Sequence, residues 1–228
     1  MPKQFDNELD VLQDKLIDME RLAEDMMDNA LKGLLEWNIA PFEPNLAIEE
    51  RINKAQTEID EHTVHLITVY TPVAADLRRL LMITRINAEL ERVGDQLSNI
   101  GFYSKQMLRE PAVKELVDLP KMIEITKEMF TDSMQAFKQE SKEQALAVIR
   151  KDDTVDSLND QIFRDLMDLV IQDPSVLKQS MELILTARAF ERIADHSVNI
   201  AEDVIYMIKG HDVRHRRLTD VESELSEG

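Results

Sequence analysis

The sequence predicts an all-α protein, built as a tandem repeat of two antiparallel three-helix bundles. Only five of the 228 residues are glycine, while Leu, Ile, Met, Ala and charged residues dominate, a composition that favours long helices. The seven prolines stand at intervals that separate helices. A pattern of polar and apolar residues in the first half of the chain also returns in the second half.

In the first half, proline positions set the expected helices. A first helix, expected over residues 3–37, ends before a pair of prolines, because proline cannot continue a helix beyond its first turn. Pro72 separates a second helix, over residues 45–70, from a third, over residues 73–107. Within the third helix, apolar residues recur at helical spacing at Leu90, Val93, Leu97 and Ile100.

The fourth and fifth helices are delimited by prolines and by a capping motif. Pro111 and Pro120 bracket an acidic connector, after which a fourth helix runs to Gln139. Ser141 and Gln144 form a capping-box pattern, which predicts the start of a fifth helix. Its apolar positions, Val155, Leu158, Ile162, Leu166 and Leu169, keep the helical period.

The sixth helix completes the second bundle. An Asp-Pro pair at 173–174 ends the fifth helix and begins the sixth, which is expected to stop at Gly210. The predicted domains are a first three-helix bundle over residues 1–112 and a second over residues 118–210. Residues 211–228 are polar and lack a helical period, so we expect a mobile tail there.

Charge and composition exclude several classes of function. The net charge of −18 argues against nucleic-acid binding, because so acidic a chain repels phosphate backbones. Without cysteine, the chain has no disulfide, thiolate nucleophile or Cys-ligated metal site. The N-terminal MPKQFDNELD has no signal-peptide pattern, and no apolar run is long enough to span a bilayer. We therefore expect a cytoplasmic protein.

The repeat is the strongest signal in the sequence. ERVGDQLSNI begins at Glu91 and ERIADHSVNI begins at Glu191, 100 residues later. In each copy a Glu and an Asp lie four residues apart, so both project from one helix face, away from the apolar stripe. Two like charges at this spacing repel each other. Their recurrence in both halves therefore favours a binding role, and clustered carboxylates are the ligands that hard cations prefer.

A metal site would need ligands from a second helix. Antiparallel pairing about the turn at Asp173 brings three acids of the fifth helix, at 152, 153 and 156, towards Glu191 and Asp195. In the first half, Gln56 and Thr57 replace two of these acids, and Asp60 is the remaining counterpart. The metal is expected to be iron, zinc or manganese. The predicted ligands are Glu91, Asp95, Asp60, Asp152, Asp156, Glu191 and Asp195.

Two alternatives to a metal-binding regulator stay open. The acids can form a solvated face on a metal-free helical scaffold. A metal-dependent helical enzyme is the second alternative, but ferritin-like bundles use inward Glu-x-x-His pairs, and no His follows a Glu at that spacing. The chain also lacks a P-loop and a G-x-S-x-G elbow, so we do not expect an enzyme.

Several segments together resemble the phosphate uptake regulator (PhoU) family. They are LERVGDQLSNI from Leu90, FERIADHSVNIAEDV from Phe190, TPVAADLRRLL from Thr71, and the elements around Asp60 and Asp156. The resemblance implies a tandem pair of three-helix bundles with metal clusters on their outer faces, held by the acids named above. Gln56 departs from the acid usual at its position, so the resemblance implies full metal occupancy less firmly in the first half.

The same resemblance implies a role in phosphate regulation. It implies a cytoplasmic negative regulator of phosphate uptake and of phosphate-starvation signalling. The expected partners are the ATPase subunit of a phosphate ABC transporter and a sensor histidine kinase, so the protein would meet membranes only through these complexes. The broad bundle faces also suit a homodimer.

Overall fold

Every element of the chain is helical in the computed structural model, which describes residues 3–113, 118–210 and 212–214. None of these residues lies in a strand. The helices are α1 (Lys3–Leu35), α2 (Asn45–Tyr70), α3 (Ala75–Met107), α4 (Asp118–Gln139), α5 (Lys142–Gln172) and α6 (Leu177–Lys209), with short 3-10 turns η1 (Ala40–Phe42) and η2 (Pro174–Val176). The predicted all-α fold is confirmed. The predicted tail, residues 211–228, lies almost entirely outside the described residues.

The helix ends agree with the punctuation in the sequence, with small differences. The Ser141 hydroxyl accepts a hydrogen bond from the Gln144 backbone N–H and caps α5, and Gly210 ends α6 at a positive φ of 75°. The first helix ends two residues earlier than predicted, because Trp37 adopts a left-handed conformation with φ of 50°. The sixth begins at Leu177 and not at Pro174, since residues 174–176 form the tighter turn η2.

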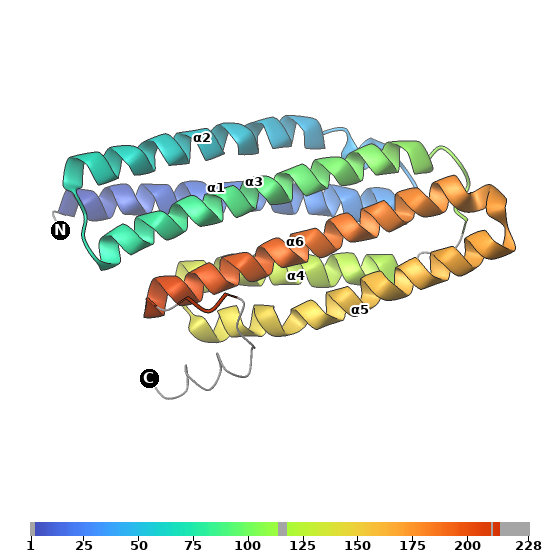
Figure 1. The fold of residues 1–228 in the computed structure, drawn as a ribbon. Coiled ribbons are helices and arrows are strands. Elements are labelled where there is room, and N and C mark those ends of the chain that lie inside the picture. The colour runs from blue at the N-terminus through green and yellow to red at the C-terminus, as the bar shows by residue number, and fades with distance from the viewer. Residues whose placement is uncertain (1–2, 114–117, 211, 215–228) are drawn as a thin grey trace.

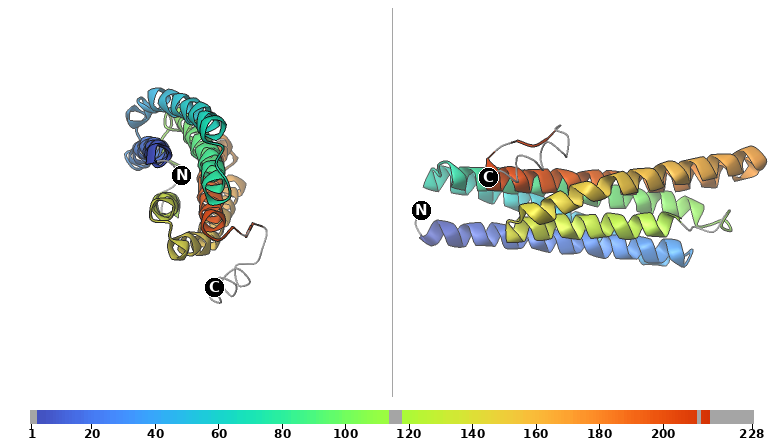
Figure 2. Two further views of the ribbon diagram at one scale, coloured as in Figure 1. Left: turned by 90° about the vertical axis from the view of Figure 1, so that its left-hand side faces the viewer. Right: turned by 90° about the horizontal axis from the view of Figure 1, so that it is seen from below.

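The six helices form two layers (Figure 1). Helices α2, α3, α6 and α5 lie side by side in that order, with α1 and α4 behind them. Helix α1 packs on α2 and α3, and α4 packs on α5 and α6, which gives two three-helix bundles. Figure 2 shows that the four-helix layer is curved, with α1 and α4 on its inner side. We call the surface of this layer that is turned away from α1 and α4 the outer face.

The two bundles meet where α3 packs antiparallel against α6. The Arg85 guanidinium contacts the Asp203 carboxylate at 3.0 Å, and the Arg78 Nε donates to the Met207 carbonyl at 3.0 Å. Together with the 100-residue repeat, this pairing places a pseudo-twofold axis near Val93 and its counterpart Ile193. The equivalent acids of the two halves therefore face the same side of the molecule.

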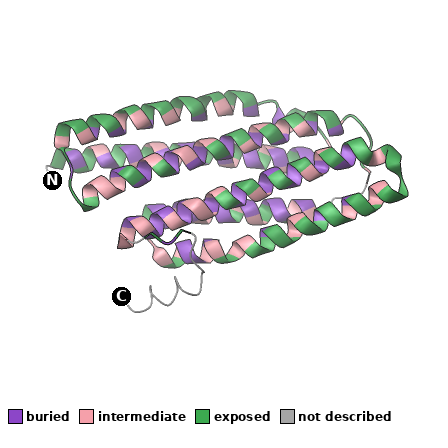
Figure 3. Cartoon of the chain, viewed as in Figure 1, coloured by how far each residue is buried: buried purple, intermediate pink, exposed green. Residues whose placement is uncertain are grey.

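The two bundles differ in how far their rear helix extends. Helix α1 has 33 residues and α4 has 22. The first turns of α1 bury Phe5 and Leu9, and the ring of Phe5 meets that of Tyr70 at 5.4 Å near the end of α2. Helix α4 has no counterpart to these turns, and the end of the α5–α6 hairpin projects beyond the other helices (Figure 2). Figure 3 shows mostly exposed residues at this end. In the described part of the chain, no helix is long and apolar enough to cross a membrane.

Candidate functional site

Four acids of the second half gather on the outer face. Glu191 and Asp195 lie on α6 outside its core-facing stripe, and Asp152 and Asp156 lie on the adjacent α5. Burial, together with the charges of Asp156 and Asp195, raises the pKa of Asp152 from 3.8 to about 6. Partial burial, followed by the charge of Asp156, also raises the pKa of Asp195. The structure thus brings together the second-half acids that the sequence singled out, as one electrostatic cluster.

The pKa values of Glu191 and Asp156, the other two acids of the cluster, are also raised. Partial burial and then the charge of Asp195 raise the pKa of Glu191, although Arg188 opposes this effect. Partial burial and the charges of Asp153 and Asp160 raise the pKa of Asp156. All four carboxyls thus resist ionisation. A cation at this cluster would remove the repulsion.

The donor set of this cluster fits a hard cation. The Oδ1 atom of Asp152 is buried and accepts no hydrogen bond. Such an atom carries a desolvation cost that a cation or a donor would relieve. Among the described residues, however, no three acid or histidine side chains converge closely enough to hold a metal ion. Binding would therefore require the carboxylates to move together, and the metal roles of these residues stay a prediction.

Sequence reasoning missed one acid near this cluster. Burial raises the pKa of Glu202 to about 7, and the charges of Asp203 and Asp152 are among the other causes. Glu202 lies seven residues after Asp195, so two helical turns place both on related faces of α6. That spacing was available in the sequence. The repeat concealed it, because the counterpart of Glu202 in the first half is Phe102.

The first-half acids are arranged differently. Partial burial and the charge of Asp95 raise the pKa of Glu91, and Glu49 of α2 adds to this effect. The Asn87 amide donates at 3.0 Å both to the Asp60 carboxylate and to the Gln56 backbone carbonyl. Asp60 is therefore already hydrogen-bonded within the protein. Glu49 is a further acid near Glu91 that the repeat pattern did not reveal.

A partly buried hydrogen bond between a glutamate and a histidine links the two halves beside these clusters. The Glu89 carboxylate contacts His196 Nδ1 at 2.7 Å and accepts from the Asn199 amide at 3.2 Å. Burial acts to raise the pKa of Glu89, but these two hydrogen bonds outweigh it and hold the pKa below its ordinary value. A cavity of about 290 Å³ opens next to this contact, around the pseudo-twofold axis, lined by Arg92, Asp95, Gln96, Arg192, Asp195 and His196.

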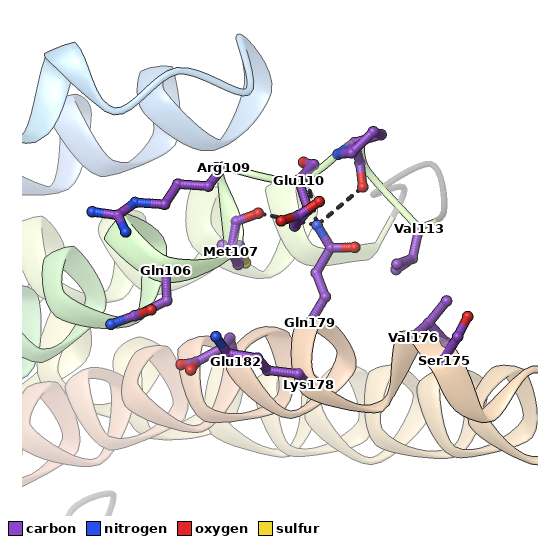
Figure 4. Close-up of a pocket in the computed structure, with 11 residues that line it drawn as sticks. Gln106, Met107, Arg109, Glu110, Val113, Ser175, Val176, Lys178, Gln179 and Glu182 are labelled. Carbon is purple, nitrogen blue, oxygen red and sulfur yellow. Dashed lines mark hydrogen bonds between the residues drawn. The ribbon is translucent and has the colours of Figure 1, made fainter.

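A second cavity, of about 600 Å³, lies between the end of α3 and the start of α6 (Figure 4). The Gln179 amide crosses it and donates to the carbonyls of Met107 at 3.0 Å and Pro111 at 3.1 Å. This side chain therefore ties the last residue of α3 and the loop that follows it to the start of α6. The lining mixes Arg109 and Lys178 with two glutamates, so it presents no single charge to a ligand.

A comparison with family models matches each half of the chain separately. The family model described as "PhoU domain" matches the chain twice, over residues 16–103 and over residues 119–204. The phosphate-specific transport system accessory protein PhoU homolog of Aquifex aeolicus is 37% identical over 213 residues, covering 93% of this chain and 96% of its own. The homolog from Pseudomonas aeruginosa is 30% identical, covering 98% of this chain and 93% of its own.

Solved structures give the same result for the fold. The crystal structure of PhoU from Pseudomonas aeruginosa superposes with a TM-score of 0.88 at 29% identity and covers 91% of this chain and all of that one. The regulatory protein PhoU of the phosphate transport system from Streptococcus pneumoniae, at 24% identity, gives a TM-score of 0.84 and covers 92% of this chain and 99% of that one. The second likeness concerns the fold alone.

Proposed function

The chain belongs to the PhoU family, and on this premise we propose that it is an accessory protein of a phosphate-specific transport system. Its role would be to restrain phosphate uptake and phosphate-starvation signalling. The observation that carries this proposal is the double match of the family model, which covers both bundles. Relatives that align over nearly their whole length are named as accessory proteins of such a system. We accordingly propose a regulator without enzymatic activity.

The partners we propose are those of a cytoplasmic adaptor. They are the ATPase subunit of a phosphate ABC transporter and a sensor histidine kinase. The chain carries a net charge of −18, which favours basic patches on such partners. The long helices offer broad faces for contact, including contact with a second copy in a homodimer.

A metal cation at the second-half cluster is the finer part of the proposal. Asp152, Asp156, Glu191 and Asp195 would hold iron, zinc or manganese, and in the first half Asp60, Glu91 and Asp95 would do so more weakly. The raised pKa values of the second-half acids and the unpartnered Oδ1 of Asp152 support this assignment. A bound cation would neutralise the cluster and offer a bridging point for an anionic group. The protein's own carboxylates would position it.

A metal-free adaptor is the competing form of the same function. It is favoured by one observation: no three acidic or histidine side chains in the described ranges meet in a coordinating arrangement. Elemental analysis of purified protein after loading with manganese, and separately with iron and zinc, distinguishes the two. Stoichiometric metal supports the metal-binding adaptor, and its absence under all three conditions supports the metal-free form.

The regulatory role is tested by deleting the gene and measuring phosphate uptake in phosphate-rich medium, together with a reporter of starvation-gene expression. We expect both to rise on deletion and to return to normal with the wild-type gene. Complementation with the double variant Glu191→Gln and Asp195→Asn tests the cluster in the same strain. Unchanged uptake and unchanged reporter expression on deletion contradict the proposed function.

A further inference from the structure

The end of the α5–α6 hairpin carries a surface of large apolar side chains that no other described element covers. On α5 they are Phe163, Met167 and Ile171, exposed by 50%, 36% and 74%. On α6 they are Leu177, Met181 and Leu185, exposed by 47%, 53% and 38%. We call these six residues the hairpin patch. We propose that the patch binds an amphipathic helix of a partner protein, with basic residues at the end of that helix that reaches the second-half carboxylates.

The two rows of the patch lie beside each other. Each row repeats every four residues, so its members project from one face of their helix. Because α5 and α6 pack antiparallel about the turn at η2, residues equidistant from the turn are neighbours. Ile171 then lies across from Leu177, and Phe163 from Leu185. Two parallel ridges of this kind form the groove into which a third helix packs.

The shortness of α4 leaves the end of the α5–α6 hairpin without a rear helix, so this end stands clear of the other helices (Figure 2). The family segment begins at residue 16 in α1, thirteen residues after α1 starts, but at residue 119 in α4, one residue after α4 starts. The additional turns of α1 cover the end of the α2–α3 hairpin with buried Phe5, Leu9 and Leu12. The α5–α6 hairpin has no equivalent rear turns within the described residues. The patch itself lies on the outer face, because Leu177 precedes Asp195 by 18 residues and Phe163 follows Asp156 by seven, both close to whole numbers of helical turns. Figure 3 shows the end of the hairpin as largely exposed.

The described residues of the first half carry no matching pair of apolar rows. By the 100-residue register, the counterparts of Leu177, Met181 and Leu185 are Leu77, Leu81 and Arg85. Arg85 is engaged in the ion pair with Asp203, and Leu77 is only partly exposed. Leu81 is 47% exposed, close to the value for Met181, and Val73 and the partly exposed Leu77 precede it at four-residue spacing. The exposed valines of α2, Val64 and Val69, are five residues apart and therefore do not form a second row on one helix face. Leu81 therefore offers a matched control for Met181.

Charge on the same face identifies the occupant. Glu191 lies ten residues beyond Met181 on α6, about 15 Å along the helix. Asp156 and Asp160 lie seven and three residues before Phe163 on α5. Arg188 and Arg192 oppose the charge of Glu191, but Asp156, Asp160, Glu191 and Asp195 together outnumber these two cations. A helix of about four turns would span both regions, with apolar residues over the patch and Lys or Arg over the acids.

The same charges disfavour two other occupants. A second copy of the chain would bring another set of acids to the interface, on a molecule that also carries a charge of −18. An anionic membrane surface repels an acidic face. The inference rests on the proposed adaptor role, because an adaptor must hold a partner. It assigns the surface and the chemistry of that partner.

The binding test uses a fluorescein-labelled synthetic peptide of about 18 residues with a leucine stripe at helical spacing and lysines in its last two turns. Fluorescence anisotropy is measured against wild type, Met181→Glu and Leu81→Glu. We expect Met181→Glu to weaken binding by about 10-fold or more and Leu81→Glu to leave it unchanged. A peptide with glutamates in place of the lysines should bind at least about 10-fold more weakly to the wild type. Equal binding of both peptides, or equal binding by both variants, overturns the proposal.

Further measurements separate loss of the patch from loss of the fold and from other occupants. Circular dichroism and thermal melting check each variant, and if Met181→Glu melts early, Ile171→Glu, at a more exposed position, replaces it. Sedimentation velocity tests for a dimer that Met181→Glu dissociates. Flotation with phosphatidylglycerol vesicles tests for membrane binding that Met181→Glu abolishes. Either result would assign the patch to that other occupant and overturn the partner helix.

Complementation of the deletion strain distinguishes failure of this inference from failure of the proposed function. If deletion leaves phosphate uptake unchanged, the regulatory role fails, whatever the peptide measurements show. If deletion raises uptake, we expect Leu81→Glu to restore control and Met181→Glu to fail at equal protein level. Full restoration by Met181→Glu would overturn the hairpin patch as the regulatory docking surface.

Discussion

The two halves share a Glu-x-x-x-Asp pair, Glu91 and Asp95 in the first and Glu191 and Asp195 in the second, which we call the ridge of each half. The helix packed beside the ridge differs between them. In the second half α5 supplies Asp152, whose Oδ1 has no hydrogen-bond donor and whose pKa is raised to about 6. In the first half Gln56 stands at the equivalent position of α2. There, Asn87 also donates to Asp60, whereas its counterpart in α6 is Ala187, which has no donor.

The comparison teaches that a duplicated ridge does not by itself make two equal sites. The ridge places two carboxylates on the outer face of each half. The neighbouring helix then decides whether further acids accumulate or are replaced by amides. A cation stabilises carboxylates most where they repel one another strongly and accept no hydrogen bonds from the protein. The second half is therefore the better candidate for a metal site.

The largest expected effect comes from removing each ridge in turn. We expect the double variant Glu191→Gln and Asp195→Asn to weaken manganese binding at the tighter site by about 100-fold or more, because two anionic ligands are lost. The matched variant Glu91→Gln and Asp95→Asn should leave that tighter site intact. Isothermal titration calorimetry on chelator-treated protein measures both, and equal losses from the two variants would break the comparison.

A smaller effect is expected from rebuilding the first half in the image of the second. Gln56→Asp restores the missing acid, and Asn87→Ala removes the amide that Asp60 accepts from. Together they should raise the affinity of the first-half site for manganese by about 10-fold, since one ligand is added and one is released. Unchanged affinity would mean that the two sites differ for reasons beyond these positions. Circular dichroism controls for the buried cavity that Asn87→Ala leaves.

The smallest effect concerns pH and the metal-free protein. The pKa of Asp152 is about 6 in the folded chain and 3.8 ordinarily, so the folded state binds its proton more tightly. Its contribution to stability is therefore present below about pH 4 and is lost as the pH rises through about 6. After allowance for solvent screening, Asp152→Asn should stabilise the chelated protein on the order of 1 kcal/mol at pH 7.5 and very little at pH 4.

Urea unfolding at the two pH values measures this difference. Asp60→Asn is the matched control in the first half, where the carboxylate already accepts a hydrogen bond from Asn87. We expect no comparable gain in stability from that variant at pH 7.5, since it replaces the charged acceptor of the Asn87 amide by a neutral one and so weakens an existing hydrogen bond. A gain as large as that of Asp152→Asn would show that the two carboxylates experience similar repulsion.

Much of the fold was predictable because local rules act within a few residues. Prolines and the Ser141 cap place helix ends without reference to the rest of the chain. The errors arise where a turn adopts an unusual conformation. Trp37 enters the left-handed region, and its indole donates to the Glu110 carbonyl at 2.7 Å, a contact between distant segments that no local pattern announces.

The site was predictable only where the two halves agree. The ridge acids recur at 100 residues, so their shared outward direction could be derived from helical spacing. Glu89 and His196 could not be found in this way, since their counterparts are Ala189 and Gln96. Contacts between the halves join unlike residues, and a search for similarity passes over them.

This unlikeness has a consequence for the seam between α3 and α6. Around the pseudo-twofold axis, two copies of the first half would set Arg85 against Tyr103 and Glu89 against Gln96, so neither polar group would find the partner it has now. Separating the two halves would therefore not give a single-bundle protein that pairs with itself through the same polar contacts. Each half now carries polar groups whose partners lie only in the other half, so both halves must stay in one chain to keep these contacts.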